Sequence, residues 1–181
     1  MDTGMQKKKE SGFSLIETMF AIMVLSFGVL SLAAVLASGI AYMNSSQSDF
    51  IAQQKASEAV ESIFTARDSG ALLFAQIQNV SNLGIFSDGP QKLCDPGLDG
   101  IVGTGDDDCT KPDCIQTPGP DGILGTADDV CMPLSTFTRT IAITTNVGGD
   151  ANLRQITVTM NYTSGRFARQ YQVVTYISAT F

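Results

Sequence analysis

The chain has 181 residues, a formal net charge of -7, and neither His nor Trp. This charge argues against a general nucleic-acid binder, because neutralising phosphates requires clusters of Lys and Arg. The absence of His removes the commonest general base and a favoured metal ligand, so the composition gives an enzyme little support.

An apolar segment near the N-terminus is long enough to cross a membrane. A run of three lysines occupies 7–9, apolar residues dominate 20–37, and Glu17 is the only charged residue in 13–48. About 20 such residues span a bilayer as a helix. Because basic flanks stay cytoplasmic, we expect a single-pass membrane segment over 13–37 with the rest of the chain on the far side of the membrane.

Glu17 is unusual in this setting, since a carboxylate deep in lipid costs on the order of a few kcal/mol. The residues around it read Gly12-Phe13-Ser14-Leu15-Ile16-Glu17. With the basic leader and the apolar run, they resemble the prepilin processing site G-F-[ST]-L-[IL]-E of the type IV pilin and pseudopilin superfamily. The resemblance implies a leader peptide over 1–12, cleavage between Gly12 and Phe13 by a prepilin peptidase, and N-methylation of Phe13. It also implies that Glu17 pairs with the terminal amine of a neighbouring subunit during assembly.

Two simpler interpretations of this segment stay open. Signal peptidase could cleave after Ala37 of an ordinary secretory signal peptide, or the segment could be a plain single-pass anchor. Both leave Glu17 unexplained. The mass of the mature N-terminus distinguishes all three interpretations.

Apolar residues continue at helical spacing beyond the membrane segment, at Ala52, Ala56, Ala59, Val60, Ile63 and Phe64. We predict one long helix over 13–69 that ends near Ser69-Gly70. Residues 70–181 would form the head. A short second helix is predicted from Ala71 to Asn79.

An acidic repeat then occupies the head. Residues 96–109 recur as 118–131 with ten of fourteen positions identical, and both copies keep D-G-x-x-G-T-x-D-D. Calcium prefers carboxylate and carbonyl oxygens on Gly-rich turns, so we predict calcium ligands in both copies. The candidates are the aspartates of the two motifs, Asp99, Asp106, Asp107, Asp121, Asp128 and Asp129. The alternative is a solvated loop that uses its aspartates to build turns.

Four cysteines flank the copies within the region 94–131. An even, clustered number beyond a membrane anchor indicates two disulfides, whereas a zinc site is less well supported because no C-x-x-C pair is present. Pairing within each copy, Cys94 with Cys109 and Cys114 with Cys131, is the most economical of three possible connectivities.

The C-terminal part changes to a period of two, which is typical of strands. Apolar residues alternate with polar ones in three runs, and Gly148-Gly149-Asp150 and Thr163-Ser164-Gly165 supply turns between them. We predict a three-stranded antiparallel meander with one face on the long helix. The fold class is therefore α+β, a pilin-like long N-terminal helix on a small meander, with a disulfide-rich acidic insertion.

The amino-acid sequence of the apolar run is most similar to that of PilV-type minor pilins. This resemblance implies a non-enzymatic, low-copy subunit. It would be held in the inner membrane with its head in the periplasm, and would then join or prime a type IV pilus at the cell surface. Its partners would be other pilins, prepilin peptidase and the pilus assembly platform. The alternatives are a pseudopilin of a type II secretion system and an adhesive or DNA-capturing tip pilin. For DNA, four arginines could form a weak basic face on the sheet, Arg139, Arg154, Arg166 and Arg169.

Overall fold

The computed structural model describes residues 12, 14–165 and 167–180. The chain divides into two compact units, Met1–Met43 and Asn44–Phe181. In chain order, the elements are α1 (Leu15–Asp68), the 3-10 helices η1 (Phe74–Gln76) and η2 (Val80–Asn82), and the strands β1 (Gln91–Lys92), β2 (Cys94–Asp95), β3 (Asp108–Pro112), β4 (Cys114–Thr117), β5 (Val130–Pro133), β6 (Phe137–Val147), β7 (Asp150–Ser164) and β8 (Phe167–Ser178).

The long helix α1 has 54 residues, Leu15–Asp68, against a predicted range of 13–69 whose first residue lies outside the described part of the chain. It begins where the amides of Glu17 and Thr18 donate hydrogen bonds to the carbonyl of Ser14, at 3.0 and 3.2 Å. It ends before Gly70, whose φ of 76° reverses the chain, as glycine often does after a helix. Residues 15–43 of α1 belong to the first unit, and the remainder belongs to the second.

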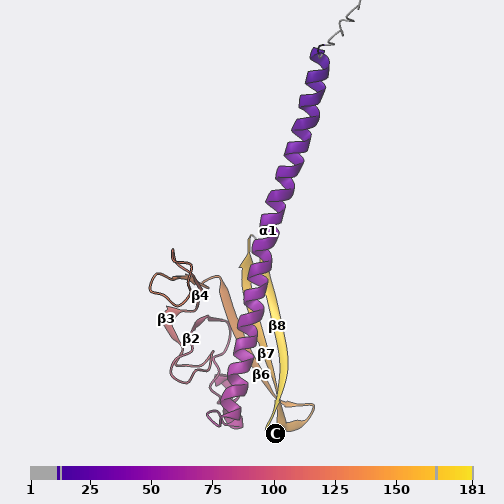
Figure 1. Ribbon diagram of the computed structural model, residues 1–181. Helices are drawn as coiled ribbons and strands as arrows, with labels where there is room; N and C mark the ends of the chain where they lie inside the picture. Colours follow the sequence, from indigo (N-terminus) through magenta and orange to yellow (C-terminus); the bar gives the residue numbers. More distant parts are fainter. Residues whose placement is uncertain (1–11, 13, 166, 181) are drawn as a thin grey trace, which may run out of the picture. The chain divides into compact units, whose positions relative to one another are not determined.

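Within the second unit, the C-terminal part of α1 lies along one face of a β-sheet (Figure 1). The helix buries a stripe of four alanines and one isoleucine at a spacing of three or four, namely Ala52, Ala56, Ala59, Ile63 and Ala66. The sheet contributes buried apolar side chains from β6, β7 and β8, including Ile141, Ile156, Val158, Met160 and Ile177. The alanines allow the helix to approach the sheet closely, and burying these apolar side chains stabilises the unit.

The large sheet has the strand order β1-β6-β7-β8. Strands β6, β7 and β8 pair antiparallel, with Ile141 opposite Val158 and Val158 opposite Val173. This is the predicted meander. Strand β1, which pairs with β6 through Gln91 and Lys92, was not predicted because a two-residue strand leaves no alternating pattern.

The predicted second helix over 71–79 is wrong. The segment contains the single 3-10 turn η1 instead, and a second, η2, follows the segment directly. The chain folds back at Gly84, where an added Cβ would lie 1.9 Å from the carbonyl oxygen of Gln78. The amides of Ile85 and Phe86 bond to the carbonyls of Gln76 and Gln78, so this backbone pairs with the returning chain rather than with an α-helical turn.

The acidic repeat forms two small antiparallel sheets, β2–β3 and β4–β5. One disulfide joins Cys94 to Cys109 across the first sheet, and the other joins Cys114 to Cys131 across the second. The pairing is the one that the sequence favoured. Together, the long helix, the meander and the disulfide-closed repeat confirm the predicted α+β fold.

Candidate functional site

The processing and assembly residues lie at the N-terminal end of α1. Gly12 is exposed and precedes the helix, and Glu17 is exposed in the first helical turn. Phe13 lies outside the described residues. Among the described residues, no ion pair involves Glu17. Its carboxylate is thus available to a cation from outside the described part of the chain.

The first unit presents an apolar helix to its surroundings. Its large apolar side chains are exposed, for example Leu25 at 67% and Phe27 at 69%. An 18-residue window of α1 has a mean hydropathy of 2.5, and the helix is long and apolar enough to cross a membrane. Exposing so much contiguous apolar surface to water is unfavourable, so this part of α1 needs lipid or other protein around it.

The two copies of the acidic repeat share one internal geometry. In the first copy, the amide of Ile101 donates to Asp99 Oδ1 at 2.8 Å, and the Thr104 hydroxyl donates to Asp106 Oδ1 at 2.6 Å. In the second copy, the matching bonds of Ile123 to Asp121 and Thr126 to Asp128 have the same lengths, 2.8 and 2.6 Å.

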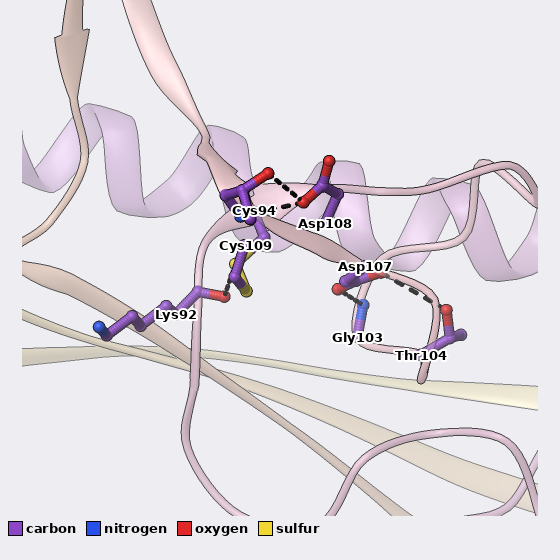
Figure 2. Close-up of a disulfide and its surroundings, with 8 residues drawn as sticks. Lys92, Cys94, Gly103, Thr104, Asp107, Asp108 and Cys109 are labelled. Carbon is purple, nitrogen blue, oxygen red and sulfur yellow. Dashed lines mark hydrogen bonds between the residues drawn. A yellow bond between two sulfur atoms is a disulfide. The ribbon is translucent and has the colours of Figure 1, made fainter.

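The amide of the second glycine in each motif donates a hydrogen bond to the last aspartate of that motif. Gly103 donates to Asp107 Oδ2 at 2.8 Å (Figure 2), and Gly125 donates to Asp129 Oδ2 at 2.6 Å. The retained motif therefore encodes one defined turn, built twice.

The surroundings of the two copies differ. Ile101 and Val102 of the first copy are each 3% exposed, and they belong to the core of the second unit. A Cβ on Gly103 would lie 2.7 Å from Cδ1 of Ile141, so this turn rests directly on β6. The equivalent residues of the second copy, Ile123 and Leu124, are each 60% exposed.

The carboxylates of the first copy have contrasting electrostatic environments. The hydrogen bond from the Thr104 hydroxyl lowers the pKa of Asp106. Burial raises the pKa of Asp107, although the Gly103 amide and the charge of Arg139 act in the opposite direction. Arg139 is only 2% exposed, and burial lowers its pKa against the attraction of Asp107, Glu58 and Asp113. A buried guanidinium therefore lies beneath the first copy and offsets part of its negative charge.

The predicted calcium ligands serve as turn-builders in the structure. Within the described residues, no group of three or more Asp, Glu, Cys or His side chains is arranged to hold a metal ion. Asp99, Asp106, Asp107, Asp121, Asp128 and Asp129 instead accept hydrogen bonds from amides and threonine hydroxyls of their own copy. Calcium binding stays a prediction, and the turn-building alternative has direct geometric support.

The three described arginines of the sheet, Arg139, Arg154 and Arg169, do not form the basic face considered for DNA. Arg139 is buried, and so is Arg154, which donates to the carbonyl of Ile77 at 2.5 Å and lies over the ring of Phe74. Arg169 pairs with Asp49 at 2.6 Å. Arg166 lies outside the described residues. Alternation in a strand places every second side chain on the helix face, and Arg139 and Arg154 occupy such positions.

Lys55 joins α1 to the repeat, and sequence reasoning missed it. Its ammonium lies 2.6 Å from Asp113 and 2.8 Å from Glu58. Asp113 follows β3 and precedes β4, so this ion pair fixes the junction between the two copies. Its one signal in the sequence was a lysine on the buried side of an otherwise small-residue helix stripe.

Comparison with protein families found the prokaryotic N-terminal methylation motif over residues 7–33. Comparisons with curated proteins and with solved structures found no match. The matched residues include Gly12, Phe13 and Glu17 and run into the exposed apolar part of α1. The chain therefore carries the N-terminal signal of type IV pilin-like prepilins, at the start of a pilin-like α+β fold.

Proposed function

We propose that the chain is a low-copy type IV pilin, a non-enzymatic subunit that joins or primes a pilus. The observation that carries this proposal is the methylation motif at the start of a helix whose apolar side chains are exposed. A helix of this kind is stored in the membrane and then transferred to a fibre core made of similar helices. The similarity of the apolar run to PilV-type sequences supports a minor rather than a major pilin.

Glu17 is the residue on which assembly depends in this proposal. After removal of residues 1–12, the new amine of Phe13 is the cation that the carboxylate of a neighbouring subunit would meet. Ion pairing in an apolar bundle is favourable only when both charges are satisfied, so the pair sets the axial position of one subunit against the next. Prepilin peptidase and the pilus assembly platform are the partners for these steps.

The test is the mass of the natural mature N-terminus together with the location of the protein. We expect a chain that begins at N-methylated Phe13, found in the inner membrane and in small amount in sheared surface fibres. A chain that begins at Ser38 would be a secreted protein with an ordinary signal peptide, which would contradict the proposal. A correctly processed chain that never reaches surface fibres, and that supports type II secretion, would be a pseudopilin.

A further inference from the structure

The first copy of the repeat packs an apolar pair of residues against the core, whereas the equivalent pair of the second copy is exposed. We propose that the Ile123 and Leu124 face of the second copy docks on the head of another subunit of the same assembly. Its target would be an apolar β-strand surface bordered by Lys or Arg. The inference rests on the proposed function for the presence of that subunit, and on the first copy for the chemistry of the contact.

The first copy shows what this face binds. Its Ile101 and Val102 are buried in the core, and Gly103 lies against Cδ1 of Ile141 on β6. The carbonyl of Gly103 accepts a hydrogen bond from the amide of Ser87 at 2.8 Å. The acceptor surface therefore offers an apolar strand and a backbone amide, and the buried charge of Arg139 attracts Asp107 without a direct ion pair among the described residues.

The second copy carries the matching groups, but within the described residues its apolar pair is exposed rather than packed. Ile123 and Leu124 replace Ile101 and Val102 and are 60% exposed. Gly125 stands where Gly103 stands in the duplicated turn. Asp129 replaces Asp107, and among the described residues its Oδ1 is buried yet accepts no hydrogen bond. The equivalent Oδ1 of Asp107 accepts a hydrogen bond from the Thr104 hydroxyl at 3.4 Å. A buried carboxylate oxygen without a donor is unfavourable, so a donor or cation from a partner would stabilise Asp129.

Charge identifies the kind of partner. Residues 112–138 contain Asp113, Asp121, Asp128 and Asp129 but no Lys or Arg. A contact between the second copies of two chains would bring like charges together, and anionic lipid would be repelled. The chain's own acceptor surface is already covered by the first copy. A different subunit with a basic residue beside an apolar strand satisfies all of these conditions.

The test is photocrosslinking in cells that assemble the natural fibre, with the full chain carrying p-benzoylphenylalanine in place of Leu124. The control carries it in place of Leu98, which is fully exposed on the first copy. We expect position 124 to give an adduct with another subunit that has a prepilin-type N-terminus. Peptide mapping should locate the crosslink on an apolar strand near Lys or Arg.

Two substitutions sharpen the test. Asp129→Asn should reduce the yield from position 124 several-fold, whereas Thr136→Ala, an exposed change outside the copy, should not. The inference is overturned by a yield from position 124 no higher than from position 98, by adducts only with lipid or with a second copy of this chain, or by an unchanged yield in Asp129→Asn.

The N-terminal mass is measured on the same sample. Correct processing without the adduct overturns the docking alone, whereas an unprocessed or Ser38-initiated chain overturns the proposed function.

Discussion

The ammonium of Lys55 lies 2.6 Å from a carboxylate oxygen of Asp113, and both side chains are largely buried. The amide of Asp113 also donates to the carbonyl of Leu93, and its carbonyl accepts from the amide of Leu134. One residue of the repeat is thus held to the helix, to the segment before the first copy and to the segment after the second. The orientation of both copies on the head depends on this junction.

Replacing Lys55 with Met should lower the free energy of unfolding by about 1–3 kcal/mol, because the largely buried Asp113 would lose a charged hydrogen-bond donor. The measurement is thermal or denaturant unfolding of the full chain in detergent. Lys111→Met is the matched control, since Lys111 pairs with Asp108 at 3.6 Å on the surface, where about 0–0.5 kcal/mol is expected. Equal effects of the two substitutions would contradict the assigned role of Lys55.

Replacing Ile101 with Ala should destabilise the head by about 2–4 kcal/mol, because the side chain is buried in the core. The same change at Ile123 should alter stability by less than about 0.5 kcal/mol in the isolated chain, because that side chain is exposed. Unfolding of the two variants under identical conditions checks this pair. A similar loss at both positions would show that the two copies are equally packed.

Tyr162 should make the head less stable in alkali. Burial and a 2.7 Å hydrogen bond to Asp49 raise the pKa of its phenol to about 12. The unfolded state therefore loses this proton first, from a pH of about 10, and stability falls between pH 10 and 12. Tyr162→Phe should cost about 1 kcal/mol at neutral pH and should reduce the loss of stability over that alkaline range. An unchanged alkaline profile in the variant would exclude Tyr162 as its source.

Replacing Glu17 with Ala or with the isosteric Gln should leave cleavage after Gly12 intact and reduce the amount of chain in fibres. Both changes remove the charge that is expected to meet the amine of Phe13. Mass spectrometry measures processing, and immunoblots of sheared fibres measure incorporation. Normal entry of the Ala variant into fibres would refute the pairing.

Calcium at millimolar concentration should raise the melting temperature of the full chain if the acidic repeat binds it, and magnesium should not. The bound cation would relieve repulsion among the clustered aspartates. Asp106→Asn and Asp128→Asn test the two copies separately. The absence of any shift with calcium would leave these residues as turn-builders alone.

Periodicity predicted the parts of the fold whose stability comes from one buried face. Ala52, Ala56, Ala59 and Ile63 repeat at helical spacing, and the three C-terminal runs alternate, so the helix and meander follow directly from the sequence. The segment 71–79 has helix-forming residues, but it is too short to be helical without packing. Long-range hydrogen bonds override the helical tendency of this segment. The buried side chain of Asn79 bonds to the carbonyl of Ile141 at 2.7 Å and to the amide of Ile143 at 2.8 Å. Such long-range pairing leaves no local pattern.

For the candidate site, the sequence located the processing motif, the duplication and the disulfide pairs. It could not show that one copy is buried and its twin exposed, because the two differ little in composition. Ile101 and Ile123 both follow Asp-Gly, and each precedes one aliphatic residue and Gly-Thr. Their different burial depends on which copy lies against β6 in the folded head.

Each disulfide closes one copy of the repeat, and neither joins α1 to the meander. A head made in a reducing cytosol would therefore keep the packed helix and the large sheet but would lose the covalent closure of both acidic turns. Recombinant material intended for study of the repeat should accordingly be exported to an oxidising compartment, whereas work on the helix and meander alone does not require export.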